Sequence, residues 1–283
     1  MSGLFAKAAE LQRQNGAFAL LHIVQSRGST PRHSASMLVS EEGETVGTIG
    51  GGMMERLAIE QATQALSEGR SQLFHARLAR QGRDAVGSDC GGDMTVFIAV
   101  YPRRPALYLF GAGHVNRAVA QAAQPLGFSV VVADTWEKNL CDPALPADCR
   151  CISGESYSRI IEELTLDAQG YAIIATNSQD SEVLKAIVTR PLAYLGLLAS
   201  RRKAWRFRES LKNEQGLNDE ALAHFHSPVG IDIAAETPEE IAISILGDIV
   251  RHYRQANRQR SNEKINEQGG LELLTAVPQT TAV

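Results

Sequence analysis

Beyond residue 105 the chain alternates short, almost wholly apolar segments with segments of helical spacing. The segment 171–175, Tyr-Ala-Ile-Ile-Ala, contains no charged residue, and such a strand suits a parallel sheet that helices cover on both faces. The alternation therefore predicts repeated βαβ units and a Rossmann-like, parallel-sheet α/β domain. The strands predicted in this part of the chain are 106–110, 129–133, 150–153, 171–175 and 193–198.

The earlier part of the chain predicts a small α+β domain instead. Helical spacing at 4–14 and 53–67 accompanies β-forming segments at 18–25, 36–39, 44–48, 73–78 and 94–100. The segment 101–105 interrupts both patterns with two prolines and two arginines, which indicates a linker. We therefore expect an N-terminal domain over 1–103, a Rossmann-like domain over 104–256 and a polar, disordered tail over 257–283.

Charge and cysteine content narrow the class of protein. A net charge of −4 and a pI of about 6.0 give no electrostatic reason to expect nucleic acid or an acidic membrane as a partner. The most apolar stretches, 17–24 and 241–250, are too short to span a bilayer. Four cysteines in a chain of this size do not form a disulfide framework and fit a reducing compartment. We expect a soluble, cytoplasmic protein.

A glycine motif follows the first strand predicted for the Rossmann-like domain. The sequence 110–116, Phe-Gly-Ala-Gly-His-Val-Asn, stands between a strand and a helix, as a dinucleotide fingerprint does. Gly111 would allow the tight turn, Gly113 would let a pyrophosphate approach, and Asp134 would bond a ribose hydroxyl. Asn116 takes the place of the third glycine. The motif predicts the fold but leaves open whether a nucleotide, another ligand or nothing binds, and whether His114 contacts a ligand or only packs.

Two glycine-rich loops in the N-terminal part, 28–32 and 47–52, suit a phosphate-bearing ligand. Consecutive glycines ahead of a helix turn several backbone N–H groups toward one point and form an anion nest. Arg27 and Arg32 can add bidentate contacts. The alternative is a hairpin turn and a flexible start to a helix. The candidate contacts in these loops are Gly28, Ser29, Thr30, Arg32, Gly50, Gly51 and Gly52.

Cys90 precedes Gly91 and Gly92, so its sulfur is open to approach and nearby amides can lower its pKa. A thiolate there could ligate a soft metal or accept sulfur, whereas composition alone favours an inert thiol in a turn. The remaining cysteines lack the spacing of a zinc motif, and we expect them to be buried thiols. They are Cys141, Cys149 and Cys151.

Two further pairs of residues carry weaker signals. His224 and His226 alternate before a proline-containing loop and are interpreted as packing residues rather than metal ligands. Arg201 and Arg202 follow a predicted strand and open a helix. They form either a second anion contact at the carboxyl edge of the sheet or a solvated basic turn.

Several segments taken together resemble one family. GSTPR at 28–32, GTIGGG at 47–52 followed by Glu55, and CGG at 90–92 are similar to the N-terminal domain of the XdhC/CoxI family. FGAGHV at 110–115, SRRK at 200–203 and HSPVGIDIAAETPEEIA at 226–242 are similar to its Rossmann-like C-terminal domain. The similar segments occur in the order that the family shows.

The resemblance implies an accessory factor that binds molybdenum cofactor (molybdopterin) and protects it while its terminal sulfido ligand is installed. The factor then delivers the cofactor to a xanthine dehydrogenase-type molybdenum hydroxylase apoenzyme, and a cysteine desulfurase supplies the sulfur. Under this hypothesis the glycine loops, Glu55 and Cys90 line a site between the two domains, with Cys90 as the candidate metal contact. The other candidate contacts are Gly91, Gly92, Gly111, Gly113, His114, Asp134, Arg201 and Arg202, and no residue is assigned a catalytic role.

Three positions depart from the family pattern, and all lie in the C-terminal domain. Asn116 replaces a glycine, Trp136 stands where arginine is usual, and Asp180 alone remains of a His-Asp segment. These departures favour the N-terminal domain as the place of the essential chemistry.

Two other functions stay open. An NAD(P)-dependent oxidoreductase would use Gly111, Gly113 and Asp134, although spacing pairs no residues for hydride transfer. A docking scaffold would bring desulfurase and apoenzyme together without a ligand and would need an exposed apolar patch. The residues favour a cofactor chaperone over a catalyst, and a homodimer is compatible with that role.

Overall fold

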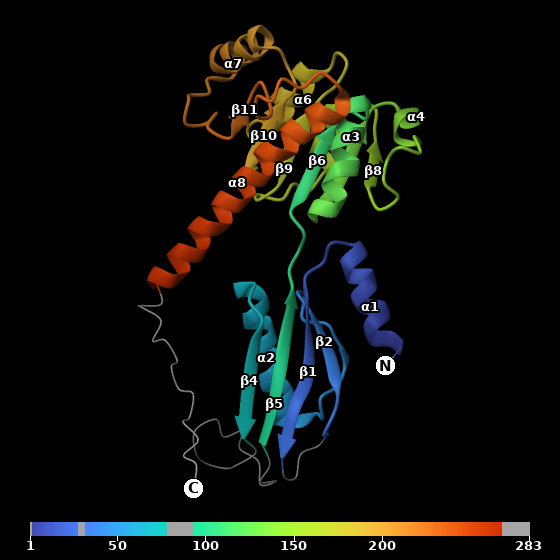
Figure 1. Cartoon of the computed structure of the whole chain (residues 1–283), viewed down its shortest axis with the longest axis vertical. Helices are drawn as coiled ribbons and strands as arrows, with labels where there is room; N and C mark the ends of the chain where they lie inside the picture. Colours follow the sequence, from blue (N-terminus) through green and yellow to red (C-terminus); the bar gives the residue numbers. More distant parts are fainter. Residues whose placement is uncertain (1, 28–31, 78–92, 268–283) are drawn as a thin grey trace. The chain divides into compact units, whose positions relative to one another are not determined.

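The computed structural model describes residues 2–27, 32–77 and 93–267, which divide after Arg104 into two compact units (Figure 1). Six of the candidate contacts therefore lie outside the described residues: Gly28, Ser29, Thr30, Cys90, Gly91 and Gly92. Within the described ranges, no helix combines the length and the apolar character needed to cross a membrane.

The N-terminal unit is an antiparallel sheet with a helix on each face. Its strands are β1 (Phe18–Arg27), β2 (Ser36–Ser40), β3 (Thr45–Gly47), β4 (Gln72–Arg77) and β5 (Asp93–Tyr101), in the order β3-β2-β1-β5-β4. Helix α1 (Ser2–Arg13) packs on one face and helix α2 (Gly52–Glu68) on the other. The small α+β fold predicted for this part is confirmed.

The pattern of β1 shows why this sheet needs two helices. Successive side chains of a strand point to opposite faces. Phe18 and Leu20 belong to the core cluster that includes α1, whereas Ala19 and Leu21 belong to the cluster that includes α2. Both faces are therefore buried, which explains the unbroken apolar run at the start of the strand.

The C-terminal unit is a parallel sheet in the Rossmann order. Its strands are β6 (Ala106–Phe110), β7 (Ser129–Asp134), β8 (Arg150–Ser153), β9 (Tyr171–Ile174), β10 (Tyr194–Leu197) and β11 (Phe225–His226). They are arranged β8-β7-β6-β9-β10-β11, so the direction of winding reverses between β6 and β9. The predicted Rossmann-like fold is confirmed.

Helices cover both faces of this sheet. The α-helices are α3 (His114–Ala123), α4 (Glu137–Leu140), α5 (Tyr157–Glu163), α6 (Asp180–Ile187), α7 (Arg201–Gln215) and α8 (Pro238–Glu267), and a 3-10 helix η1 spans Gln124–Leu126. Helices α3 and α8 pack on one face, and α5, α6 and α7 pack on the other. The nearly continuous apolar strands predicted from sequence follow from this double cover.

Helix α8 begins as the sequence predicts and ends later. Glu240 Oε2 accepts from the Thr237 N–H at 3.0 Å, and the Glu240 N–H donates to Thr237 Oγ1 at 3.3 Å, which forms a capping box. The helix continues to Glu267, past residue 256 where the sequence places the end of the domain. Arginine, glutamine, lysine and glutamate are good helix formers, so the polar composition after 255 does not end the helix.

Candidate functional site

The carboxyl edge of the C-terminal sheet starts with the turn after β6. Gly111 has φ +94°, and a Cβ there would lie 2.5 Å from the carbonyl oxygen of Ala175, just after β9. The tight turn predicted at Gly111 is therefore present and requires glycine. Gly113 differs, because its φ is −76° and no heavy atom lies within 4 Å of where its Cβ would be. Gly113 leaves open space beside the backbone.

Asp134, at the end of β7, is directed toward donors of its own chain. Its Oδ2 accepts from the Ala112 N–H at 2.7 Å and from Asn139 Nδ2 at 3.2 Å. Its Oδ1 accepts from the Trp136 N–H at 2.8 Å, and the residue is only 6% exposed. The carboxylate therefore holds the glycine turn against β7, and a ribose hydroxyl would have to compete with these donors.

Asn116, in the position of the third fingerprint glycine, is fully buried. Its Nδ2 donates to the carbonyl oxygens of Phe110 at 2.9 Å and Gly111 at 2.7 Å. The asparagine thus joins α3 to the end of β6 by hydrogen bonds where a glycine would allow closer packing. Its Oδ1 is buried and has no hydrogen-bond partner among the described residues.

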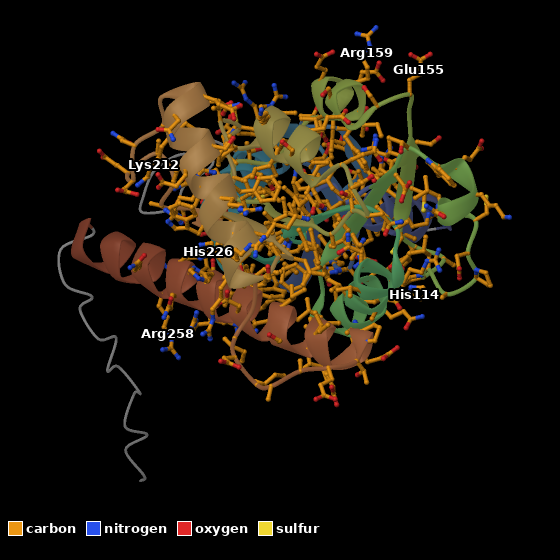
Figure 2. The ribbon with its side chains drawn as sticks, turned by 90° about the horizontal axis from the view of Figure 1, so that it is seen from above. His114, Glu155, Arg159, Lys212, His226 and Arg258 are labelled. Atoms are coloured by element: carbon orange, nitrogen blue, oxygen red, sulfur yellow. The ribbon has the colours of Figure 1, made fainter. Side chains whose placement is uncertain are left out.

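Helix α3 starts at this edge without a side-chain cap. Gly113 is its N-cap residue and offers no side-chain acceptor to the N–H groups of residues 114–116, which have no acceptor within the helix. Helices α5 and α7 are capped by Ser156 and Ser200. An anion would satisfy the open N–H groups of α3 and would be favoured by the helix dipole. His114 lies exposed on this first turn (Figure 2).

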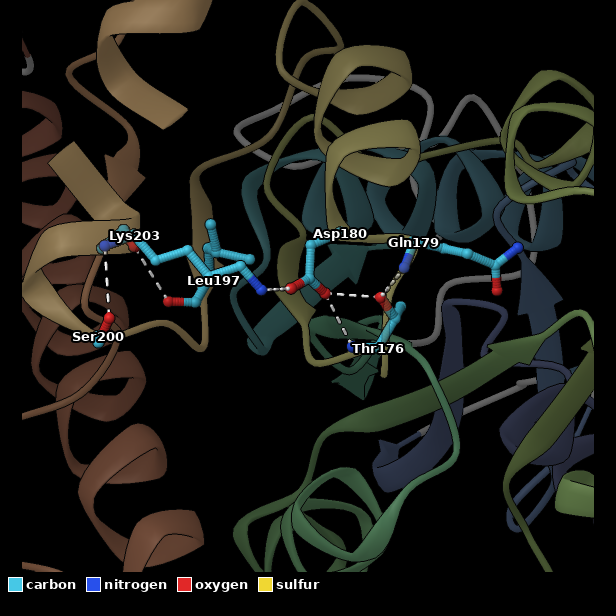
Figure 3. A network of polar contacts seen from close by, with 7 residues as sticks. Thr176, Gln179, Asp180, Leu197, Ser200 and Lys203 are labelled. Carbon is cyan, nitrogen blue, oxygen red and sulfur yellow. Dashed lines mark hydrogen bonds and ion pairs between the residues drawn. The ribbon is translucent and has the colours of Figure 1, made fainter. Parts of the chain in front are cut away.

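A second buried carboxylate lies near the carboxyl ends of β9 and β10. Asp180, on α6, is 3% exposed, and its Oδ1 accepts from the Thr176 N–H at 3.0 Å and from Thr176 Oγ1 at 2.6 Å. Its Oδ2 pairs at 2.6 Å with Nζ of Lys203, from the first turn of α7 (Figure 3). The Lys203 side chain is 47% exposed, so the edge that carries the α3 N-terminus also carries a partly solvated ammonium.

The arginines before Lys203 are solvated cations at the same edge. Arg201 and Arg202 open α7 and are both exposed. The Arg201 guanidinium lies 3.7 Å from the carboxylate of Asp232, with exposed fractions of 89% and 84% for the two side chains. Such an exposed pair contributes little to stability.

In the N-terminal unit, the residues that flank the predicted motifs lie toward the same end of the sheet. In the strand register, Arg27 at the end of β1 and Arg77 at the end of β4 both lie opposite Asp93 at the start of β5. Strand β3 also ends on this side, where Gly47 pairs with Met37 near the start of β2. The strands therefore lead into GSTPR and GTIGGG, and out of CGG, toward the same end of the sheet. Arg32, the last residue of GSTPR and the described one, is exposed.

Backbone N–H groups of the GTIGGG loop donate hydrogen bonds to Glu55, which lies in the first turn of α2. Glu55 Oε2 accepts from the N–H groups of Ile49 and Gly51, both at 3.0 Å, and from the Thr48 hydroxyl. The Gly50 N–H donates to Thr48 Oγ1 at 3.1 Å. The predicted nest is thus filled by a carboxylate of the chain itself, and a phosphate at this loop would have to displace Glu55.

We expect Glu55→Gln to lower the free energy of unfolding by about 1 kcal/mol at pH 7 and by less at pH 4. Burial raises the pKa of Glu55, but hydrogen bonds from the Thr48 hydroxyl and from the loop amides outweigh burial and hold the pKa below its ordinary value. A carboxyl group with a lowered pKa stabilises the fold above its unfolded pKa, and this stabilisation is lost as pH falls through the folded pKa.

Urea denaturation at the two pH values measures this effect. Glu60→Gln is the matched control, because its carboxylate pairs with Arg56 on the exposed side of the same helix. A deficit in Glu55→Gln that stays the same at pH 4 would contradict the charge-dependent role of Glu55.

The expectation of buried cysteines is wrong for Cys141 and Cys151, which are exposed, whereas Cys149 is half-buried. Cys151 is exposed because β8 is an edge strand and pairs only with β7, whereas Cys141 lies at the end of the short helix α4. Burial, with Asp148 and Cys151 nearby, raises the pKa of the Cys149 thiol to about 11, so this thiol is neutral at pH 7. In the described part of the chain, no cluster of metal-ligand type includes these cysteines.

Sequence reasoning missed one group with the character of a metal site, formed by His226, Asp248 and His252. His226 is interpreted above as a packing residue, and its two companions come from α8. The signal that could have drawn attention is the spacing of Asp248 and His252, four residues apart on one helix face.

Comparisons with known proteins agree with this two-part structure. The XdhC Rossmann domain matches residues 107–249, and the XdhC and CoxI family matches residues 11–77. The protein named Uncharacterized protein YqeB of Escherichia coli (strain K12) is 52% identical over 248 residues, which are 88% of this chain and 46% of that protein. A probable xanthine dehydrogenase subunit of Bacillus subtilis (strain 168) is 32% identical over 158 residues, which are 55% of this chain and 45% of that protein. This chain spans less than half the length of either relative.

Among solved structures, that of a xanthine dehydrogenase from Bacillus halodurans is 20% identical and covers 87% of this chain and 95% of that one, with a TM-score of 0.49. The Rossmann-domain match extends over half of this chain, and the second match falls in the N-terminal part. The chain belongs to the XdhC and CoxI family.

Proposed function

We propose that this chain is an accessory factor for a xanthine dehydrogenase-type molybdenum hydroxylase, and that it binds molybdenum cofactor as cargo and delivers it to the apoenzyme. The observation that carries the proposal is the match to both parts of the XdhC and CoxI family. The relative described as a probable xanthine dehydrogenase subunit supports the class of client. A cysteine desulfurase as sulfur donor and a homodimer as the working form belong to the same proposal.

The phosphate of the cargo fits the start of α3. The first turn lacks a side-chain cap, and Gly113 leaves the space beside it open. Arg202, exposed at the start of α7, adds positive charge at the same edge of the sheet, whereas Lys203 and Arg201 pair with Asp180 and Asp232. A phosphate bound there would satisfy the N–H groups of the first turn and would be favoured by the helix dipole.

In the N-terminal unit, Cys90, which lies outside the described residues, is proposed as a contact for molybdenum, because a thiolate can ligate a soft metal. The strands that flank CGG and GSTPR support this assignment, because both motifs are attached beside Asp93. Glu55, with the GTIGGG amides bound to it, is proposed to shape this side of the N-terminal unit rather than to bind phosphate.

The proposal is tested by mixing the purified chain with molybdenum cofactor released from a loaded protein. We expect pterin and molybdenum to co-elute with the chain on gel filtration, and addition of a xanthine dehydrogenase-type apoenzyme to move both to that enzyme. Absence of co-elution, while a known cofactor carrier retains the cofactor in the same buffer, would overturn the proposal.

An NAD(P)-dependent oxidoreductase is the second candidate, because the strand order suits a dinucleotide. The engagement of Asp134 with Ala112, Trp136 and Asn139 argues against it. Calorimetry with NAD and NADP separates the two functions. Binding of either nucleotide, without binding of molybdenum cofactor, would favour the oxidoreductase.

A further inference from the structure

Three side chains where α8 packs against β11 have the composition of a transition-metal site. One ligand atom each from His226, Asp248 and His252 lie within 4.8 Å of one another. His226 ends β11 and lies beside α8 (Figure 2), which supplies the other two residues one helical turn apart. We propose that these three residues bind a divalent transition-metal ion, with Zn²⁺ as the representative ion, through two imidazoles and one carboxylate.

Tyr194, on β10, holds two of the three ligands in place. Its ring stacks on the ring of His226, with centroids 4.3 Å apart and an angle of 6° between the planes. Its hydroxyl donates to Asp248 Oδ2 at 2.7 Å. Metal-ligating side chains are commonly oriented by such outer partners. Tyr194 therefore fixes the carboxylate by one oxygen and leaves Oδ1 facing His252, whose Nε2 is 3.7 Å away.

The charges around the carboxylate allow a cation to enter. Asp248 is 4% exposed, and a buried carboxylate needs a compensating charge. Arg251, one turn along α8, now supplies that charge by an ion pair to Oδ1, and its side chain is 56% exposed. The guanidinium can therefore move into solvent when a metal ion takes its place.

The distances require only a small closure. Zinc bonds of about 2.0–2.2 Å place tetrahedral ligand atoms about 3.3–3.6 Å apart, and the ligand atoms here lie within 4.8 Å of one another. His252 can close this gap by rotation, because its side chain is 32% exposed and lies at the surface of the group. Three protein ligands leave a fourth position for water. The ion would tie α8 to the edge strand β11.

Titration of the full chain, without an affinity tag, with Co²⁺ tests the site. Co²⁺ distinguishes the proposed ligands from the four cysteines of the chain, because thiolate ligands add an intense near-ultraviolet charge-transfer band. We expect one equivalent of Co²⁺ to give visible d–d bands without the thiolate charge-transfer band. Zn²⁺ should displace the bound Co²⁺ and remove the d–d bands. His252→Ala should abolish these bands, whereas His75→Ala, at an exposed histidine that bonds Thr95 in the N-terminal unit, should retain them.

Arg251→Ala gives an independent test that does not remove a ligand. Loss of the competing guanidinium is expected to tighten Co²⁺ binding severalfold, and a purely structural ion pair would give no such gain. Circular dichroism checks that each variant is folded. Equal binding by wild type and His252→Ala, or no thiolate-free d–d bands in wild type, would overturn the proposal.

Discussion

Gly111→Ala is expected to lower the free energy of unfolding of the C-terminal unit by about 3 kcal/mol or more. The backbone of Gly111 has φ +94°, which a residue with a side chain adopts only with strain. In addition, the new Cβ would lie 2.5 Å from the Ala175 carbonyl oxygen, so the turn after β6 or the end of β9 must move. Urea denaturation followed by tryptophan fluorescence measures the effect, because Trp136 and Trp205 both belong to this unit.

Gly113→Ser is the matched control for Gly111→Ala. Gly113 has φ −76° and open space around its Cβ position, and serine is a better N-cap residue than glycine. We expect a change within about 0.5 kcal/mol, in the stabilising direction. Similar losses for both variants would show that the two glycines have the same role, contrary to the geometry.

Asp134→Ala is expected to cost about 3 kcal/mol, because it leaves the buried N–H group of Ala112 and the partly buried N–H group of Trp136 without an acceptor. Asp134→Asn should lie between wild type and alanine, since its amide oxygen can serve only part of the donors. The same urea assay gives the values.

Asp232→Asn is the control for Asp134, because that carboxylate is 84% exposed and pairs only loosely with Arg201. Its expected effect is within about 0.5 kcal/mol. If Asp134→Ala cost no more than Asp232→Asn, the carboxylate of Asp134 would not be what holds the glycine turn.

The fold could be predicted because local patterns and tertiary packing agree. The apolar run of 171–175 predicts a doubly covered strand, and β9 lies inside the sheet with helices on both faces. The end of α8 could not be predicted in this way. Loss of apolar periodicity after residue 255 marks where the helix leaves the core, and good helix formers carry it further.

The positions of these candidate residues on the fold could be predicted, but their hydrogen bonds could not. Spacing places Asp134 at the end of β7, yet it does not show that the oxygens face the N–H groups of Ala112 and Trp136. In the same way, glycines at 50–52 predict converging amides, and only the fold shows that Glu55 is the anion they meet. In both cases a carboxylate of the chain accepts hydrogen bonds from the backbone of a nearby loop.

Contacts between distant parts of the chain were beyond sequence reasoning. His226 approaches Asp248 and His252 only because β11 packs against α8. Lys203 meets Asp180 only because β9 and β10 are neighbours in the sheet. A single sequence contains the residues of such pairs but no information on their pairing.

Binding of the cargo phosphate at the start of α3 is tested by Gly113→Asp. An aspartate at the N-cap accepts hydrogen bonds from the first-turn N–H groups, and its charge would occupy the anion position while leaving the fold intact. Wild type and variant are isolated from a cell that makes molybdenum cofactor, and pterin per chain is measured by mass spectrometry. We predict pterin in wild type and at least about tenfold less in the variant, at a urea midpoint no lower than that of wild type. Equal pterin in the two proteins would contradict phosphate binding at this helix, and no pterin in wild type would contradict the cargo itself.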